Sequence, residues 1–235
     1  MLLFPITIYY LSPYLIIQGA LDGIINGSFI VFCAMLLSGI FFGRIFCAYL
    51  CPAGGIQECA ALIKDKGPKQ GGRNKIKYVI WAVWIIGVIV SFLFRKREIS
   101  IDFFYMTDHG ISVANVFGYI IYYGIILLIF LPAVFAGKRT MCHYVCWMAP
   151  FMVIGSKLGT LLHIRQLHLE AKKELCVNCH ACDKQCPMSL RVSEKVQAGN
   201  MADSECILCG ACIDGCPKRA ISYKMSNVKS RRTVT

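Results

Sequence analysis

The chain has 235 residues, of which 57% are hydrophobic, with a mean hydropathy of +0.58 and a formal net charge of +12. This apolar composition excludes an ordinary soluble domain. The positive charge would suit nucleic acid, but most basic residues flank apolar segments, which indicates membrane topology and argues against a nucleic-acid partner.

Four apolar stretches lie before residue 137, and we predict membrane spans at about 2–20, 28–46, 78–94 and 116–136. A membrane-crossing helix needs roughly 17 to 25 mostly apolar residues. The first stretch contains Pro5 and Pro13, so we expect it to be kinked or partly re-entrant. Together the four stretches predict a membrane domain over residues 1–163.

Charge predicts the orientation of these spans. The turn after the first span carries only Asp22, whereas the loop after the second is strongly basic. The basic residues are Arg44, Lys64, Lys66, Lys69, Arg73, Lys75 and Lys77. The positive-inside rule therefore predicts a multi-pass protein of the cytoplasmic membrane with residues 43–77, both termini and the C-terminal domain in the cytoplasm. The triplet Arg95–Arg97 fits this topology least well.

Two cysteine runs follow the last span, CVNCHACDKQCP at 176–187 and CILCGACIDGCP at 206–217. Each reads C-x2-C-x2-C-x3-C-P, and two copies are the pattern of bacterial two-cluster ferredoxins, in which the fourth cysteine of each run ligates the other cluster. We predict an α+β ferredoxin-like domain over 164–235 with two [4Fe–4S] clusters. The predicted ligands are Cys176, Cys179, Cys182 and Cys216 for the first cluster, and Cys206, Cys209, Cys212 and Cys186 for the second.

Other chemistries would use these cysteines less completely. Zinc or disulfides would not explain two matching four-cysteine spacings. The stretch from Cys176 to His180 also matches the C-x-x-C-H haem-attachment pattern, which would use two cysteines and require export. We therefore interpret His180 as a surface residue of the cluster loop.

A weaker motif also occurs twice, as RIFCAYLC at 44–51 and RTMCHYVC at 139–146. Both read R-x-x-C-x-Y-x-C, and each follows the second span of a predicted hairpin, 1–63 or 78–163. This indicates a parallel internal repeat with a pseudo-two-fold axis along the membrane normal. Residues four apart share a helix face, so each copy is expected to present two thiols and an arginine to one side.

Two such pairs supply four thiols, Cys47, Cys51, Cys142 and Cys146. Four thiolates suffice for one iron–sulphur cluster or one zinc ion, and Arg44 and Arg139 would offset residual negative charge. Helix packing and a dithiol/disulfide couple remain alternatives. His143 could be a ligand or a packing residue, and the isolated Cys33 and Cys59 are interpreted as packing.

With these motifs, the chain resembles the NapH- and NosR-like membrane iron–sulphur proteins over nearly its whole length. The resemblance implies four membrane helices with two C-x3-C-P motifs, followed by a cytoplasmic two-cluster ferredoxin domain. It implies Cys47, Cys51 and Pro52 for the first motif, and Cys142 and Cys146 for the second. Trp147 replaces the second proline, so we expect the helix break to be delayed to Pro150. The large flavin-bearing domain of NosR-like relatives is lacking, so a flavin would have to belong to a partner.

The resulting prediction is a mainly α protein: a four-helix membrane domain of two pseudo-repeated hairpins plus the ferredoxin-like domain. We expect an oxidoreductase-type electron-transfer subunit of a larger complex, typical of anaerobic metabolism. A basic surface would suit a soluble ferredoxin. The bilayer core is about 30 Å thick, so a quinone or a partner's cofactor would complete a transmembrane path. The alternatives are a metal-reducing or thiol-redox maturation factor and a passive ferredoxin anchor.

Overall fold

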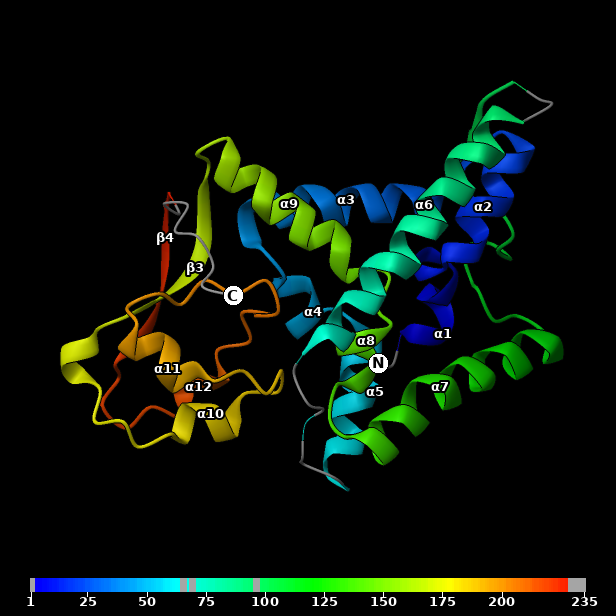
Figure 1. Cartoon of the computed structure of the whole chain (residues 1–235). Helices are drawn as coiled ribbons and strands as arrows, with labels where there is room; N and C mark the ends of the chain where they lie inside the picture. The colour runs from blue at the N-terminus through cyan, green and yellow to red at the C-terminus, as the bar shows by residue number, and fades with distance from the viewer. Residues whose placement is uncertain (1–2, 64–66, 68–70, 95–97, 228–235) are drawn as a thin grey trace.

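The computed structural model describes residues 3–63, 67, 71–94 and 98–227, and most of its elements are helices (Figure 1). The charges of Lys64, Lys66, Lys69 and Arg95–Arg97, used above to predict topology, lie outside the described residues. The elements up to residue 161 are α1 (Phe4–Thr7), η1 (Ile8–Leu11), α2 (Pro13–Asp22), β1 (Ile24–Asn26), α3 (Gly27–Phe42), α4 (Ile45–Tyr49), α5 (Pro52–Ala61), η2 (Gly72–Lys75), α6 (Ile76–Leu93), β2 (Ser100–Asp102), α7 (Val116–Ala136), α8 (Thr140–Tyr144) and α9 (Ala149–Leu161).

Two of the four predicted spans are helices long and apolar enough to cross a membrane, at Gly72–Leu93 and Val116–Ala136. The second predicted span forms α3, an apolar helix of 16 residues. The first is divided into α1, η1 and α2, because Pro13 has no N–H to donate and begins a new helix. Two spans are thus present as long helices, and the four-span arrangement remains a prediction.

The apolar helices α3 and α7 begin and end with similar signals. The Asn26 side chain accepts a hydrogen bond from Phe29 N at 3.0 Å, and the Asn115 side chain accepts one from Gly118 N at 2.8 Å. Such caps satisfy amide groups that a helix leaves free at its start. Both helices end at a glycine with positive φ, 57° at Gly43 and 110° at Gly137. Glycine permits these angles at little cost, so each chain direction changes just before a cysteine motif.

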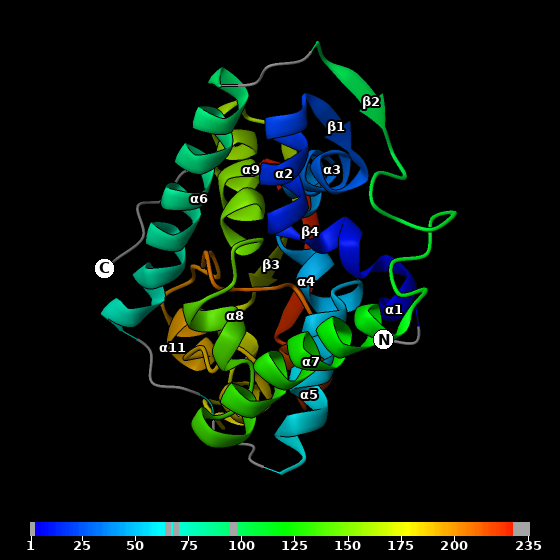
Figure 2. The ribbon, with the colours of Figure 1, turned by 90° about the vertical axis from the view of Figure 1, so that its right-hand side faces the viewer.

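The helices of the membrane part pack in pairs. α3 packs against α9, α5 against α7 and α2 against α6, while β1 and β2 form a parallel pair. Glycine allows the closest of these contacts: a Cβ on Gly39 would lie 2.9 Å from Met152 Cα, and one on Gly159 would lie 2.5 Å from Ile40 O. In Figure 1 α3 and α9 lie side by side, and α6 and α7 diverge in both ribbon views (Figures 1 and 2).

The C-terminal part contains a two-stranded antiparallel sheet with the two cysteine runs between its strands. Its elements are β3 (Arg165–Ala171), η3 (Lys173–Leu175), α10 (Ala181–Gln185), α11 (Val192–Gln197), α12 (Ala211–Asp214) and β4 (Ile221–Asn227). In the register of the sheet, Arg165 pairs with Asn227 and Ala171 with Ile221. α9 ends two residues before the predicted domain boundary at 163/164, and β3 begins one residue after it.

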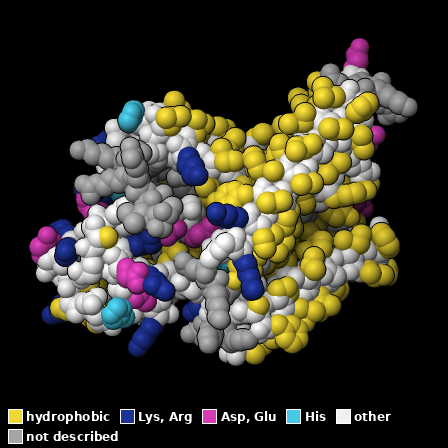
Figure 3. Space-filling model, in the orientation of Figure 1, with side chains coloured by type: hydrophobic (Ala, Val, Ile, Leu, Met, Phe, Trp, Pro, Cys, Tyr) yellow, Lys and Arg dark blue, Asp and Glu magenta, His cyan; other side chains and the backbone are white. Residues whose placement is uncertain are grey.

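The two parts of the chain share one hydrophobic core. Met152 of the membrane part and Leu169 and Met188 of the C-terminal part belong to the same buried cluster. The side chain of Gln166, on β3, donates to Ile40 O at 2.7 Å and to Ser156 O at 2.8 Å. The C-terminal part is therefore packed onto α3 and α9. Hydrophobic side chains cover α6 and α7, whereas charged ones gather on the C-terminal part (Figure 3).

Candidate functional site

The first cysteine run surrounds a hollow on the C-terminal part. Its lining includes Cys176, Cys179 and Cys182 together with Cys216 from the second run. The structure thus brings together the four cysteines predicted to ligate the first cluster. Among the described cysteines none forms a disulfide, so these thiols are available as ligands. Cys176 and Cys179, the pair in the haem-attachment pattern, line the hollow beside the other two.

The second hollow is lined by Cys206, Cys209 and Cys212, with Cys186 from the first run. Burial raises the pKa of Cys206 to about 11 and that of Cys212 to about 12, so free thiolates would be costly there. Iron ligation stabilises thiolates and removes this cost. The cysteines of both hollows therefore fit [4Fe–4S] clusters, each hollow drawing its fourth cysteine from the other run.

The two loops repeat the same backbone conformation. Asn178 and Leu208, each two residues after the first cysteine of its run, have φ of 53° and 56°. His180 and Gly210, two residues further on, have φ of 58° and 81°. These left-handed residues turn the chain around each hollow before α10 and α12 begin. His180 is exposed as expected, and its Nδ1 lies 2.9 Å from Asp183 Oδ2.

The membrane cysteines do not share one helix face, contrary to the expectation from their spacing. α4 ends at Tyr49 and α8 at Tyr144, so Cys51 and Cys146 lie beyond the helices that contain Cys47 and Cys142. In the first copy Pro52 begins α5 directly after Cys51. In the second, α8 also ends two residues before the second cysteine, so the helix break is not delayed as predicted; only the next helix, α9, begins later, at Ala149. The chain turns within each motif, and the thiols are brought together by packing between copies.

The four membrane thiols lie within electrostatic reach of one another. The pKa of Cys51 is raised first by burial and then by Cys47, Cys142 and Cys146. Within the described part of the chain, no three His, Cys, Asp or Glu side chains converge closely enough to hold a single metal ion.

Each copy also supplies a residue to the other copy's first cysteine. Gln57, six residues after Cys51, donates from Nε2 to Cys142 Sγ at 3.2 Å. Met152, six residues after Cys146, places its sulphur 4.0 Å from Cys47 Sγ. Burial lowers the pKa of the neighbouring His143 to about 4, so its imidazole is neutral at pH 7.

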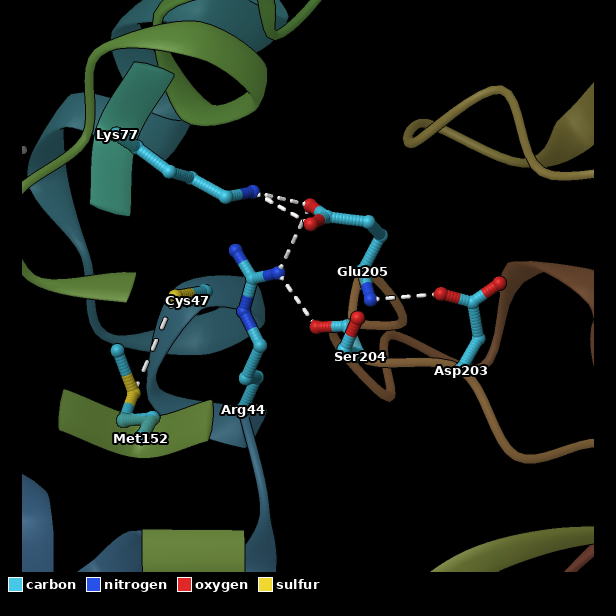
Figure 4. A network of polar contacts seen from close by, with 7 residues as sticks. All are labelled: Arg44, Cys47, Lys77, Met152, Asp203, Ser204 and Glu205. Carbon is cyan, nitrogen blue, oxygen red and sulfur yellow. Dashed lines mark hydrogen bonds and ion pairs between the residues drawn. The ribbon is translucent and has the colours of Figure 1, made fainter. Parts of the chain in front are cut away.

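Arg44 faces the C-terminal part rather than the thiols alone (Figure 4). Its Nη1 donates to Ser204 O at 2.9 Å and lies 3.2 Å from Glu205 Oε2. Lys77, at the start of α6, donates to Glu205 Oε1 at 2.6 Å. All three charged residues are buried. Two cations thus share one carboxylate beside Cys206, a predicted ligand of the second cluster.

Arg139, the equivalent residue of the second copy, contacts the first copy instead. Its Nη1 donates to Cys47 O at 2.9 Å, and its Nη2 forms an ion pair with Glu58. Arg139 Nε and two nitrogens of Arg44, Nε and Nη2, are buried without a hydrogen-bond partner among the described residues. Unpartnered donors beside four thiols would suit an anionic iron–sulphur group. The charge-offsetting role of the two arginines stays a prediction.

Two further contacts join the first copy to the second hollow. The Tyr49 hydroxyl donates to Cys209 O at 2.8 Å. A Cβ on Gly43 would lie 3.2 Å from the Leu208 side chain, so Leu208 packs closely over the end of α3. The second hollow therefore lies next to the membrane cysteine motif.

Sequence reasoning missed three residues of this region, Lys77, Glu205 and Gln57. Lys77 was considered only as a charge of the basic loop. Glu205 directly precedes Cys206, and an acidic residue beside a cluster ligand is a signal that could have been followed. Gln57 carries no signal in the sequence, because its partner Cys142 is 85 residues away.

Comparisons with known proteins agree with the cysteine arrangement. Residues 175–221 match the family described as 4Fe-4S dicluster domain, and residues 27–70 match the 4Fe-4S binding domain family. An uncharacterised protein of Methanocaldococcus jannaschii is 28% identical over 77% of this chain and 72% of its own length. The ferredoxin-type protein NapH of Haemophilus influenzae is 25% identical over 80% of this chain and 65% of its own length.

The chain is similar to NapH-like iron–sulphur proteins. The methylamine utilization ferredoxin-type protein MauN of Paracoccus denitrificans is a further relative, 24% identical over 75% of this chain and 60% of its own length. The predicted resemblance to NapH-like proteins is thus confirmed, and with it an iron–sulphur electron-transfer role. The part that this chain matches makes up less than two thirds of the length of several relatives, NapH and MauN among them. No solved structure matches the chain.

Proposed function

We propose that this NapH-like protein relays electrons between a soluble carrier and the membrane through three cysteine sites in series. The first hollow would be the outer site, the second the middle site, and Cys47, Cys51, Cys142 and Cys146 the inner site. Iron–sulphur clusters bound at these sites would supply one-electron oxidation and reduction. The observation that carries the proposal is the hydrogen bond from Tyr49, between Cys47 and Cys51, to Cys209 O of the second hollow.

The contacts of the inner site support a cluster held by both copies of the motif. Four mutually coupled thiols, a donor from Gln57 and the unpaired donors of two buried arginines surround it. The segment that matches the 4Fe-4S binding domain family contains Cys47 and Cys51. The reciprocal contacts α3 with α9 and α5 with α7 support the pseudo-two-fold repeat that such a shared site requires.

In this proposal the chain is a multi-pass subunit with its cysteine sites on the cytoplasmic side. The inner site alone does not cross a hydrocarbon core of about 30 Å. A quinone, or a cofactor of a partner subunit, would therefore receive or supply the electron inside the membrane. A soluble ferredoxin or a similar protein would exchange electrons with the chain on the cytoplasmic side.

The test is iron and acid-labile sulphide per chain, measured on anaerobically purified protein. We expect about twelve irons in the wild type and about eight in a Cys47→Ser/Cys142→Ser double variant. A Cys33→Ser/Cys59→Ser double variant is the matched control, because both thiols are exposed and outside the sites, and it should keep about twelve. About eight irons in all three proteins would exclude a third [4Fe–4S] cluster and favour the thiol-redox alternative.

A further inference from the structure

The two hollows differ in how much solvent can reach them. Cys179 of the first hollow is exposed, and its other three cysteines are partly exposed. In the second hollow Cys186 and Cys212 are buried. The membrane part contacts the chain around Cys206 and Cys209 at three points. Tyr49 binds Cys209 O, Gly43 lies against Leu208, and Arg44 binds Ser204 O. A soluble protein can therefore approach the first hollow, while the membrane part occupies one side of the second.

The surface beside the first hollow has an apolar centre. Val177 and Leu175 are 60% and 45% exposed, although both are large and apolar, and Val177 lines the hollow. They lie within three residues of Cys179 or Cys176. Protein interfaces commonly combine such apolar side chains at their centre with a polar rim.

The chain segments around the first hollow are basic. Five exposed cations lie within four residues of a cysteine of the first hollow: Lys172, Lys173, Lys184, Lys218 and Arg219. Among the described residues none of the five forms an ion pair, whereas Lys195, which lines the second hollow, is paired with Asp203 at 2.8 Å. Two exposed carboxylates, Glu174 and Asp214, lie at similar positions, and Asp183 is engaged by Ser193 and His180.

We infer that the surface of Leu175, Val177, Lys173, Lys184 and Lys218 is the docking site for a soluble, acidic one-electron carrier protein. These basic segments complement an acidic partner and would accelerate its encounter. One electron crosses this contact, so the carrier is oxidised when the protein is reduced, or the reverse. This inference rests on the proposed electron-transfer function, and it assigns exchange with soluble partners to the first hollow.

The test is binding of a purified acidic two-cluster ferredoxin to the full-length, iron-loaded protein in detergent at low ionic strength. The patch variant is Lys173→Gln/Lys184→Gln/Lys218→Gln. The control is Lys157→Gln/Arg165→Gln/Lys224→Gln, which removes the same charge from exposed positions on α9, β3 and β4. We expect about tenfold weaker binding for the patch variant, a reduced salt dependence, and a change within about twofold for the control.

Equal weakening in both variants, or none in either, would overturn the inference. Iron and sulphide content measured on the same samples shows whether each variant keeps its clusters. A Val177→Glu variant gives an independent check, because it places a negative charge at the apolar centre without removing a cation, and it should weaken binding too. Binding is read separately from iron content, so an inner site without iron would refute the relay and leave the docking result interpretable.

Discussion

The two copies of R-x-x-C-x-Y-x-C share a sequence pattern but make different contacts. In the first copy, Arg44 and Tyr49 contact residues 204, 205 and 209 beside the second hollow. In the second copy, Arg139 contacts the backbone of Cys47 and the side chain of Glu58, both in the first copy. One ferredoxin-like part cannot contact both copies in the same way. The equivalent arginines therefore have different roles: one joins the two parts of the chain, and the other joins the second motif to the first hairpin.

The copies remain alike where they contact each other. Gln57 and Met152 occupy equivalent positions, and each approaches the first cysteine of the other motif. Their chemistry nevertheless differs, because an amide donates a hydrogen bond to sulphur and a thioether does not. The contacts of Gln57 and Met152 thus follow from the repeat, whereas those of Arg44 and Tyr49 depend on the attached C-terminal part.

The largest expected effect is that of Glu205→Gln, which breaks the contact made by the first copy. The change leaves Arg44 and Lys77 buried beside a neutral amide. Removing one partner of a buried ion pair costs about 3–5 kcal/mol. We expect a lower melting temperature and faster proteolysis between α9 and β3, as the ferredoxin-like part separates from the membrane part.

Two further variants test whether Arg44 and Arg139 have different roles. Glu58→Gln removes the carboxylate that pairs with the buried Arg139, but Glu58 is 50% exposed and Arg139 still donates to Cys47 O, so we expect a smaller cost, about 1–2 kcal/mol. Glu170→Gln breaks only an exposed pair with Lys224 and should change neither readout. If Glu58→Gln and Glu205→Gln had equal effects, the two arginines would not have the different roles assigned to them.

An intermediate effect is expected from exchanging the residues that approach the cysteines. Gln57→Met removes the donor to Cys142, and Met152→Gln introduces an amide beside Cys47. Hydrogen bonds to cluster sulphurs stabilise the reduced, more negative state. We expect Gln57→Met to lower the reduction potential of the inner site and Met152→Gln to raise it, each by about 20–60 mV, measured by a redox titration followed by electron paramagnetic resonance. Shifts in the same direction would contradict this assignment, and the double exchange should approach the wild-type value.

Local sequence spacing predicted the parts of the site that depend on neighbours along the chain. The grouping of Cys186 with the second run and Cys216 with the first follows from the ferredoxin pattern, and each cysteine lines the predicted hollow. The long apolar helices α6 and α7 were predicted for the same reason, since their composition alone decides them.

Contacts between distant residues could not be predicted in this way. The expected shared helix face failed because Gly43 and Pro52 bracket a helix of only five residues, α4. Both residues are visible in the sequence and indicate a short helix, which the i, i+4 spacing alone does not. The partner of Arg44 is 161 residues away, and a single sequence contains no signal that links Arg44 to Glu205. Lys77 likewise could not be linked to Glu205, because in the sequence it resembles any charged residue at the start of a span.

The smallest expected effect is that of Tyr49→Phe, which removes one hydrogen bond between the first copy and the second hollow. Tyr49 is 64% exposed, so water can replace part of the bond to Cys209 O, and we expect a cost of about 0.5–1 kcal/mol. This should appear as roughly two- to fivefold faster amide hydrogen exchange around residues 206–210, with no change in iron content. Tyr14→Phe, at an exposed position on α2, is the control and should leave these amides unchanged. Unaltered exchange in Tyr49→Phe would mean that the other contacts, those of Arg44, Lys77 and Leu208, hold the second hollow against the membrane part. The contact that the relay requires would then be tested by Glu205→Gln.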